Sequence, residues 1–581
     1  MCGIVGYVGR REAASLIIEG LKKLEYRGYD SFGVATLGSG IELAKYQGRI
    51  SEYAGTAIRL HGKIGIGHTR WATHGIPNDI NAHPHLDCAN RIAVVHNGII
   101  ENFSELKRAL VSRGHRFRSD TDTEVIVHLI EEAYAQQKDL CRAVEETVPL
   151  LRGSYALLVI AVDDKHLVAA RNGSPLVIGI GDKENFAASD MTPLLEHTER
   201  AVFLEDGDIA SLTPGAVEIF HDKKPVTRPV ELIDWSPEAA KKGGFAHYMV
   251  KEIYEQPQAF FNTTRAIGNG AIPKIARKPA WVTIVACGSS YHAGLIARYL
   301  IEEFCGIPTR LEFGSEFRYF PPPVDGLVIG ISQSGETADT LTALKQARAH
   351  NCQTLAITNV LGSSVSRIAD ATLFMRAGPE ISVAATKSFI TQLAVMMQMI
   401  NTWTGGKCEE VLLHAHQSIE DVLLMDLSGP VSLCIAAKGI FYVGRGPFYG
   451  VSLEGALKMK EISYIHAEGY AAGELKHGPF ALLTPETPVI AICMPGETYG
   501  VMIANIKEIK ARGAPVIALG SEGDSELSDV VDIFIALPLT HQFVQVLTSL
   551  VVLQLLAYYT AVALGRDVDK PRNLAKSVTV E

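Results

Sequence analysis

The sequence predicts a layered α+β domain followed by two similar α/β domains with parallel sheets. Three observations lead to this fold class. Residues 1 to about 220 mix short strand patterns with helical ones. After a change of composition, apolar strands alternate with Gly-rich turns and helices, and this pattern begins again near residue 430. Strands and helices in βαβ order form parallel sheets, so the second and third domains are a tandem repeat.

The composition is that of a globular chain with several large cores. Of 581 residues, 47% are hydrophobic and 20% are charged, which excludes disordered and coiled-coil proteins. Asp and Glu number 64 against 54 Lys and Arg, giving a net charge of −10, and no long basic run occurs. Nucleic acid is therefore not expected as a partner.

The number and spacing of the cysteines and the apolar segments indicate in which cellular compartment the protein is located. The nine cysteines are scattered without a C-x-x-C pair, which disfavours a disulfide framework and a structural zinc site and predicts reduced thiols in the cytoplasm. The first residues lack the apolar stretch of a signal peptide. Residues 544–565 are uncharged but contain Gln545, Gln554 and two tyrosines, which predicts a buried amphipathic helix and no membrane contact.

The first domain is predicted over residues 1–220. Runs such as RIAVVHNGII and SYALLVIAV are separated by Gly, Asn and Asp turns and indicate strands. A helix is predicted over 122–137, with Thr121 or Asp122 as its cap. Residues 221–247 are rich in Pro, Lys and Gly, which predicts a linker.

The two α/β domains are predicted over residues 248–415 and 416–565, and a tail over 566–581. Each domain has strands that end in Gly-rich turns, such as TIVACGSS in the first and GIFYVGRG in the second. Because open parallel sheets bind ligands at the carboxyl ends of their strands, we expect sites at these turns.

Cys2 directly follows the initiator methionine. If Met1 is removed, the thiol shares a residue with a free α-amine, whose pKa of about 8 suits it as the base for a thiol with a pKa of about 8.5. A lone cysteine here is more often a small apolar residue at a chain end. A nucleophile also needs oxyanion donors and a substrate clamp, and the next hundred residues offer both.

Polar residues in three short segments are candidates for these roles. Arg70, in HTRWATHG, can hold a carboxylate with two hydrogen bonds. The Asn97 amide and the Gly98 N–H group, in HNGIIEN, can stabilise an oxyanion. Asp122, in SDTDTE, can accept an α-ammonium group, although it also fits a helix cap.

No metal or redox cofactor is expected. His74, His83 and His85 lie close together in the sequence, but their spacing does not repeat a known set of metal ligands. We therefore predict that they are loop histidines.

The first domain resembles the class II glutamine amidotransferase family. The resemblance rests on an N-terminal Cys followed by GIVG and on EYRGYDS, HTRWATHG, NAHPH, HNGIIEN and TDTE. It implies an N-terminal nucleophile αββα sandwich in which Cys2 attacks the glutamine amide and releases ammonia. It places Asn97 and Gly98 in the oxyanion hole and Trp71 at a gate of the ammonia passage. The glutamine-binding residues that it implies are Arg70, Trp71, Thr73, His74 and Asp122.

Two serine-rich turns lie on neighbouring strands of the first α/β domain. Residues 332–337 read SQSGET, and hydroxyl and N–H groups at a helix start suit a phosphate without the lysine of a Walker A loop. Ser289 and Ser290 occupy the equivalent turn one strand earlier. One such turn alone is more often a helix cap, and the pair favours a phosphate site.

Glu454, Lys458 and Glu461 are spaced i, i+4 and i+7 on a predicted helix and so share one stripe. Taken alone this is an exposed salt-bridge ladder; the alternative is a carboxylate base tuned by a lysine. His477 is a second acid–base candidate, although a lone histidine is more often structural. Lys576 lies in a C-terminal run whose composition predicts order.

The rest of the chain resembles the sugar isomerase (SIS) family, in the tandem form that isomerising aminotransferases join to an amidotransferase domain. The motifs are KEIYEQP, ISQSGETADT, LEGALKMKEISYIHAEGYAAGELKHGP and DKPRNLAKSVTVE. The resemblance implies that Glu461 moves a proton from C1 to C2, that His477 opens the sugar ring across the interface of a homodimer, and that Lys576 lies at the ketose. The sugar-phosphate ligands that it implies are Ser289, Ser290, Ser332, Gln333, Ser334, Thr337, Val383 and Lys458.

Three residues depart from the family motifs. Ser382 and Ala385 replace a glycine and a serine in EISVAATK, and Phe32 replaces a small residue in YDSFG. Losing one hydroxyl contact costs about 1 kcal/mol, so sugar binding is expected to persist. A related sugar phosphate stays an alternative substrate. The short linker does not indicate regulation by a nucleotide sugar.

Together the resemblances imply that fructose 6-phosphate and glutamine become glucosamine 6-phosphate and glutamate, the first committed step of amino-sugar biosynthesis, without metal or cofactor. A second hypothesis keeps the amidotransferase and changes the acceptor, but loops for phosphoribosyl transfer and for ATP-dependent amidation are absent. A third hypothesis is a sugar-phosphate sensor without turnover, which predicts that Cys2 is dispensable.

Overall fold

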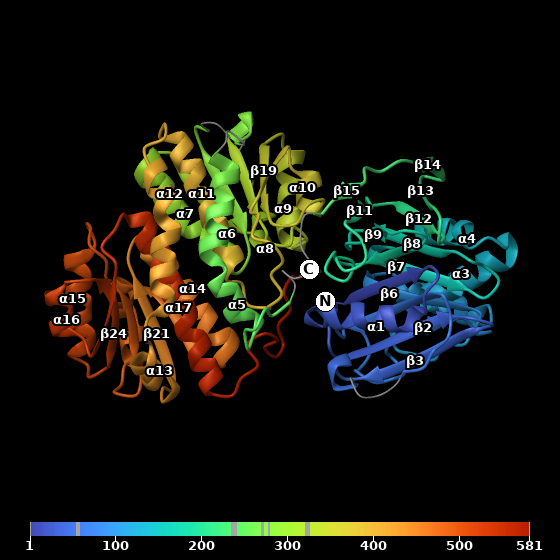
Figure 1. The fold of residues 1–581 in the computed structure, drawn as a ribbon, viewed down its shortest axis with the longest axis horizontal. Coiled ribbons are helices and arrows are strands. Elements are labelled where there is room, and N and C mark those ends of the chain that lie inside the picture. Colours follow the sequence, from blue (N-terminus) through green and yellow to red (C-terminus); the bar gives the residue numbers. More distant parts are fainter. Residues whose placement is uncertain are drawn as a thin grey trace. The chain divides into compact units, whose positions relative to one another are not determined.

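The computed structural model describes residues 2–53, 58–233, 241–268, 272–276, 279–319 and 326–579. Its internal contacts divide the chain into two compact units. One comprises Met1–Ala240 with Ser577–Glu581, and the other comprises Lys241–Lys576. In Figure 1 the first unit runs from blue to green and the second from light green to red.

The first unit contains two antiparallel sheets that pack face to face. Their order is β15-β11-β9-β10-β1-β4-β2-β3 in one and β14-β13-β12-β8-β7-β6-β5 in the other. The strands of the first sheet are β1 (Gly3–Val8), β2 (Ser31–Leu37), β3 (Ile41–Gln47), β4 (Ile64–Arg70), β9 (Val177–Ile180), β10 (Asn185–Ala188), β11 (Arg200–Phe203) and β15 (Glu231–Leu232). The strands of the second sheet are β5 (His85–Leu86), β6 (Ile92–Ile100), β7 (Gly153–Ala161), β8 (Leu167–Asn172), β12 (Asp208–Leu212), β13 (Val217–His221) and β14 (Lys224–Val226).

Helices cover the outer faces of these sheets, as Figure 1 shows. Apolar side chains from both sheets, among them Ile4 of β1 and Leu158 of β7, form one buried core between them. A second core lies between β6–β8 and the helices outside them. The layers are therefore α–β–β–α, which confirms the predicted sandwich. The helices are α1 (Ala13–Leu24) on the first sheet and α2 (Phe103–Ser112), α3 (Glu124–Gln137) and α4 (Leu140–Thr147) on the second.

The second unit contains two parallel sheets of the same topology. Their orders, β17-β16-β18-β19-β20 and β22-β21-β23-β24-β25, match strand for strand, which confirms the predicted tandem repeat. The strands of the first are β16 (Val282–Ala286), β17 (Thr309–Phe313), β18 (Leu327–Ile331), β19 (Gln353–Thr358) and β20 (Ala371–Phe374). The strands of the second are β21 (Gly439–Gly444), β22 (His466–Ala471), β23 (Val489–Ile492), β24 (Val516–Ser521) and β25 (Ile533–Leu537).

Long helices between these two sheets share one apolar core. Figure 1 shows α7 and α14 close together, and they pack directly against each other. The helices of the second unit are α5 (Tyr248–Tyr254), α6 (Gln256–Gly268), α7 (Ser289–Cys305), α8 (Gly314–Phe317), α9 (Ala338–Ala349), α10 (Ser364–Ile368), α11 (Lys387–Trp403), α12 (Glu409–Asp421), α13 (Ser428–Ile435), α14 (Pro447–Ser463), α15 (Tyr499–Lys510), α16 (Ser525–Val530) and α17 (Gln542–Ala563).

The structure differs from the sequence prediction in three details. β14 and β15 lie within the segment predicted as a linker and pair with β13 and β11, so the sheets of the first unit extend past residue 220. Helix α12 runs across the predicted boundary at residue 415. Helix α17 is buried on nearly all sides rather than on one face, because helices of both domains surround it. The other domain boundaries stay predictions.

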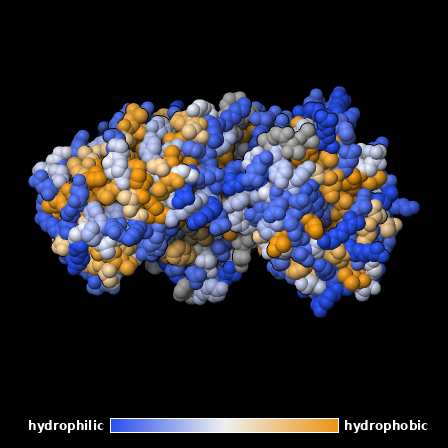
Figure 2. All heavy atoms as spheres, turned by 90° about the horizontal axis from the view of Figure 1, so that it is seen from below, coloured by the Kyte–Doolittle hydropathy of each residue, from blue (hydrophilic) through white to orange (hydrophobic). Residues whose placement is uncertain are grey.

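Helix α17 is also the one helix of the described residues that is long and apolar enough to cross a membrane, and 83% of its most apolar stretch is buried inside the protein. Such burial is typical of a core helix. On the face drawn in Figure 2, hydrophobic residues lie in several separate groups between hydrophilic ones.

Two candidate active sites

In the first unit, Cys2 lies where β1, β4 and β6 meet. Its Sγ accepts a hydrogen bond from the N–H group of Trp71 at 3.2 Å, because β1 pairs with β4 and Trp71 follows β4. The Asn97 side-chain amide of β6 donates to the Cys2 carbonyl at 3.0 Å. Burial raises the pKa of the Cys2 thiol. A thiol with a raised pKa needs a base before it can act as a nucleophile.

Gly98 and Asp122 adjoin this point. Gly98 has a φ of +125°, and a Cβ atom there would lie 2.0 Å from the Ser154 carbonyl oxygen. The buried Asp122 carboxylate accepts a hydrogen bond from the N–H group of Ile100 at 2.8 Å. The helix begins at Glu124 with Thr123 as its N-cap, so the prediction of Thr121 or Asp122 as the cap is wrong. The Asp122 carboxylate is held against β6 instead.

The loop after β4 is folded around Arg70. Its guanidinium donates to the main-chain oxygens of His74 and of Gly75, the latter at 3.0 Å. Trp71 packs edge-on against Tyr29, with ring centroids 5.5 Å apart, and Thr73 is exposed. In this structure Arg70 shapes the loop, so the glutamine-binding roles of Arg70, Trp71, Thr73 and His74 stay predictions.

Of the three histidines predicted as loop residues, His83 and His85 are buried in the core, whereas His74 is partly exposed in the loop after β4. His83 and His85 are buried, and their Nε2 atoms lie 3.2 Å from Thr123 Oγ1 and 3.1 Å from Thr121 Oγ1. Burial lowers the pKa of both rings, which disfavours their charged forms. They support the segment that carries Asp122.

In the second unit, the packing of α7 against α14 builds a buried polar cluster. Lys458 Nζ lies 2.5 Å from Glu461 Oε2, 3.4 Å from Glu454 Oε1 and 3.2 Å from Ser289 Oγ. Glu454 also accepts hydrogen bonds from Ser289 at 2.9 Å and from His292 at 2.8 Å. The side chains of Glu454 and Lys458 are 1% exposed, so the alternative of an exposed ladder is wrong.

The charges in this cluster stabilise one another. Burial opposes the charged forms, but Glu461 and Glu454 raise the pKa of Lys458 above its ordinary value. Burial likewise opposes ionisation of Glu454, yet Lys458 and His292 hold its pKa below the ordinary value. The cluster is therefore an ammonium group between two carboxylates, of which Glu461 is the more accessible, with a side chain 20% exposed.

The serine-rich turns lie at one edge of the first parallel sheet, because β16 and β18 are adjacent. Thr337 is the N-cap of α9, but its hydroxyl lies 2.9 Å from Ser332 Oγ rather than capping the helix. Gly335, with a φ of +67°, lets the turn close, and its N–H group donates to Ser332 Oγ at 3.1 Å. Helix α7 begins at Ser289, and Ser290 Oγ accepts from Gln392 at 2.9 Å. In neither turn does a serine or threonine side chain cap the helix that follows, α7 or α9.

The C-terminal segment up to Lys576 belongs to this unit. Lys576 forms a buried ion pair with Glu380, and the N–H group of Val383 donates to the Asp569 carbonyl at 3.0 Å. Ser382, which departs from the family motif, lies within 3.5 Å of the Val568 carbonyl. A second departure, Phe32, is buried in the first unit beside Tyr46. Both replacements therefore fit their surroundings.

Sequence reasoning missed several residues that complete these sites. Glu454 appeared in the helical stripe without a role, and His292 and Glu380 were not considered. The only signal for Glu454 is its spacing from Lys458. His292 and Glu380 carry no such signal, because the partners that place them in the site, Glu454 and Lys576, are far away in sequence. His477 is exposed at the end of a 3-10 helix (Ala472–His477), and its role stays a prediction.

The fold and the two sites define a class: an N-terminal nucleophile amidotransferase domain joined to a pair of sugar isomerase domains. A glutamine amidotransferase domain model matches residues 68–196, and an SIS domain model matches residues 275–402 and 434–564. The C-terminal domain of glucosamine-fructose-6-phosphate aminotransferase from Francisella tularensis has a similar structure, with a TM-score of 0.51 and 35% identity over 57% of this chain and 99% of that chain.

Full-length relatives give the particular family. The chain is 47% identical to a protein of Methanosarcina mazei and 48% identical to one of Pyrococcus horikoshii, each match covering 100% of both chains. Both relatives are named glutamine–fructose-6-phosphate aminotransferase (isomerizing). This chain belongs to the isomerising glutamine–fructose-6-phosphate aminotransferase family.

Proposed function

We propose that this protein converts fructose 6-phosphate and glutamine to glucosamine 6-phosphate and glutamate. The observation that carries the proposal is that one chain holds both a partly buried cysteine beside an amide donor and a Lys458–Glu461 pair beside Ser289, in one of two adjacent serine-rich turns. The first arrangement suits amide hydrolysis, and the second suits a proton shift on a phosphorylated sugar.

In the first half-reaction, Cys2 attacks the carboxamide carbon of glutamine. Removal of Met1 frees the α-amino group, which accepts the thiol proton and later delivers it to the leaving ammonia. The Asn97 amide and the Gly98 N–H group stabilise the oxyanion. Water then cleaves the thioester and releases glutamate. Arg70, Trp71, Thr73, His74 and Asp122 are the proposed contacts of glutamine.

In the second half-reaction, ammonia adds to the C2 carbonyl of the open-chain ketose and water leaves, which gives an imine. Glu461 takes the proton from C1 and returns it to C2, while the C1 hydroxyl loses its proton and the nitrogen gains one, so that an aldose with a C2 amino group results. Lys458 keeps the developing charge balanced beside Glu461. The phosphate is proposed to bind Ser289, Ser290, Ser332, Gln333, Ser334 and Thr337, with Val383 and Lys576 at the sugar.

The test is to incubate purified full-length protein with glutamine and fructose 6-phosphate and to measure glutamate and glucosamine 6-phosphate. Both products are expected in equal amounts. In Cys2→Ala the rate of glutamine hydrolysis should fall more than 100-fold, while amino-sugar formation from a high concentration of ammonia should persist. Cys141→Ala should resemble wild type in both assays. Normal glutamine use by Cys2→Ala would refute the assignment of the nucleophile.

The same assay separates the alternatives. A sugar-phosphate sensor would bind fructose 6-phosphate without forming either product. An amidotransferase with another acceptor would hydrolyse glutamine but leave fructose 6-phosphate unchanged.

We also propose a homodimer in the cytoplasm in which His477 of one subunit opens the sugar ring in the other. His477 is exposed on its own chain, and Leu482 nearby is 59% exposed, which leaves this segment available to a second copy. All nine cysteines are free, which is typical of a reducing compartment. Mixing inactive His477→Ala and Glu461→Gln subunits should restore part of the activity. No restoration in verified mixed dimers would contradict the shared site.

A further inference from the structure

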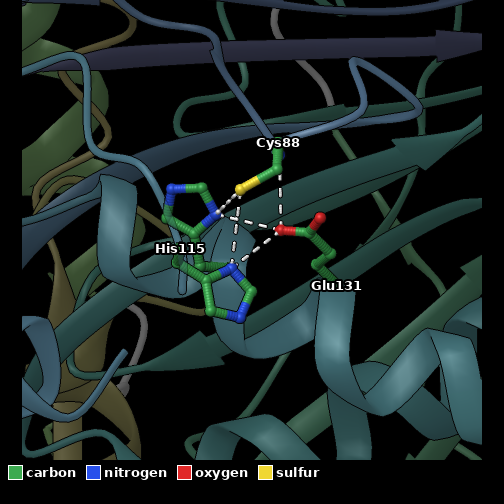
Figure 3. Close-up of side chains that lie close together, drawn as sticks. Cys88, His115 and Glu131 are labelled. Atoms are coloured by element: carbon green, nitrogen blue, oxygen red, sulfur yellow. Dashed lines mark hydrogen bonds and ion pairs between the residues drawn. The ribbon is translucent and has the colours of Figure 1, made fainter. Parts of the chain in front are cut away.

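Four side chains of the first unit converge on one point outside the predicted glutaminase site. Cys88 lies in the turn between β5 and β6, His115 follows α2, and His128 and Glu131 lie one turn apart on α3. One ligand atom from each lies within 4.8 Å of the others. Figure 3 shows Cys88, His115 and Glu131 pointing toward one another from these different elements.

The separations suit a tetrahedral metal site. Cys88 Sγ lies 3.6 Å from His115 Nδ1 and 3.7 Å from His128 Nδ1. Glu131 Oε2 lies 3.1 Å from His115 Nδ1 and 3.0 Å from His128 Nδ1. Tetrahedral Zn²⁺ with ordinary bond lengths separates its sulfur and nitrogen ligands by about 3.6 Å, and its nitrogen and oxygen ligands by about 3.3 Å. Small adjustments would therefore accommodate the ion.

Carboxylates behind the two imidazoles hold the rings in a suitable orientation. His115 Nε2 lies 3.1 Å from Glu132 Oε1. His128 Nε2, which is buried and makes no hydrogen bond of its own, faces Glu124 Oε1 at 3.7 Å. A histidine that binds a metal through one nitrogen commonly directs its other N–H group to a carboxylate. Both rings thus present Nδ1 to the common point.

We propose that Cys88, His115, His128 and Glu131 bind one Zn²⁺ ion. On binding, the Cys88 thiol and any protonated Nδ1 atom release their protons to solvent, while the imidazoles keep the Nε2 proton. A thiolate with two imidazoles and one carboxylate favours Zn²⁺ over Mg²⁺ or Ca²⁺, which prefer oxygen ligands alone.

Four protein ligands leave no open position, so the ion is structural rather than catalytic. It would tie the β5–β6 turn and the segment after α2 to α3. Asp122 lies just before the N-cap of α3, and its carboxylate is held against β6. The ion therefore stabilises the part of the first unit that positions this residue.

The experiment uses the full-length protein after exhaustive treatment with a chelator. Zn²⁺ alone is titrated back, bound metal is counted by mass spectrometry after gel filtration, and thermal unfolding is followed with and without the ion. Co²⁺ serves as a spectroscopic substitute, because a thiolate in a tetrahedral site gives it an intense visible spectrum.

We expect one Zn²⁺ per chain, a higher melting temperature with the ion, and binding at least 100-fold weaker in Cys88→Ser. Glu132→Gln removes the carboxylate that pairs with His115 and Arg113 but none of the four proposed ligands, and it should weaken binding 10- to 100-fold. Cys141→Ser and Cys2→Ala control for the other partly accessible thiols of this unit and should bind like wild type.

Two results would overturn the proposal. One is the absence of stoichiometric Zn²⁺ on the wild-type chain, which would leave the four residues as a hydrogen-bonded network. The other is unchanged affinity in Cys88→Ser. Should Cys88→Ser fail to fold, the Co²⁺ spectrum of the wild-type protein decides, because without thiolate coordination it lacks the sulfur band.

Discussion

Lys458 and Glu461 lie one turn apart on α14, and their charged atoms are 2.5 Å apart. The same ammonium group reaches Glu454 on its other side and Ser289 at the start of α7. Two helices from different repeats are thus joined by one lysine. This arrangement fixes the direction of the Glu461 carboxylate, which is the proposed base.

The first prediction concerns Glu454 as a positioning residue. Glu454→Gln removes one of the two carboxylates beside Lys458. It also weakens the hydrogen bonds that Glu454 accepts from Ser289 and His292. We expect kcat for amino-sugar formation to fall at least tenfold, while glutamine hydrolysis is unchanged, in steady-state assays of both products. Glu303→Gln, at an exposed position on α7, is the matched control. An equal loss of glutaminase activity would indicate general unfolding instead.

Gly98 allows a test of the proposed oxyanion hole. Gly98→Ala places a Cβ atom 2.0 Å from the Ser154 carbonyl oxygen at a φ of +125°, so the backbone must move. We expect glutamine-dependent activity to fall at least 100-fold and ammonia-dependent activity to persist.

Gly114→Ala is the control for Gly98→Ala, because Gly114 also has a positive φ, of +100°, but its Cβ position is open. It should cost little in either assay. If both variants lost the same share of glutamine-dependent activity, the cause would be backbone strain rather than loss of the oxyanion hole.

The third prediction concerns the pH dependence of stability. Burial, reinforced by Glu380, raises the pKa of Glu252 to about 8 from an ordinary value of 4.5. Between these values the folded state binds more protons than the unfolded state, so stability falls as the pH rises. Glu252→Gln cannot ionise and should lose this dependence. We expect its stability relative to wild type to rise by roughly 2–4 kcal/mol between pH 5 and pH 8.

Melting curves of both proteins across that pH range provide the measurement. Parallel curves would show that Glu252 does not titrate in this window.

The fourth prediction concerns the C-terminal tail. Lys576→Met leaves the buried Glu380 carboxylate without its cation. Breaking a buried ion pair by removing one partner costs roughly 3–5 kcal/mol, so we expect residues 566–576 to open. Amide hydrogen exchange of this segment should rise strongly. Lys460→Met, at an exposed position of α14, should leave exchange at the wild-type level. Unchanged protection in Lys576→Met would show that the other contacts of the tail suffice.

Much of the fold follows from local pattern. The apolar strands that end in GSS and in SQSGET predict parallel sheets and ligand turns at one edge, and the structure places Ser289 and Ser332 after adjacent strands. The predicted linker includes β14, because the Pro and Lys residues of this strand are typical of a loop. Backbone pairing with β13 nevertheless makes the segment a strand. Helix α17 was predicted as amphipathic, because its few polar residues do not reveal that both repeats pack around it.

The amino-acid sequence by itself determined the order of the domains, the repeat, and the residues that carry the family motifs, since these depend on spacing along the chain. Only the tertiary structure decided that Lys458 and Glu454 are buried, that Asp122 is held by β6 rather than capping α3, and that Cys88 meets two histidines. These features depend on contacts between side chains that are far apart along the chain. A local sequence pattern does not show which distant segments pack together.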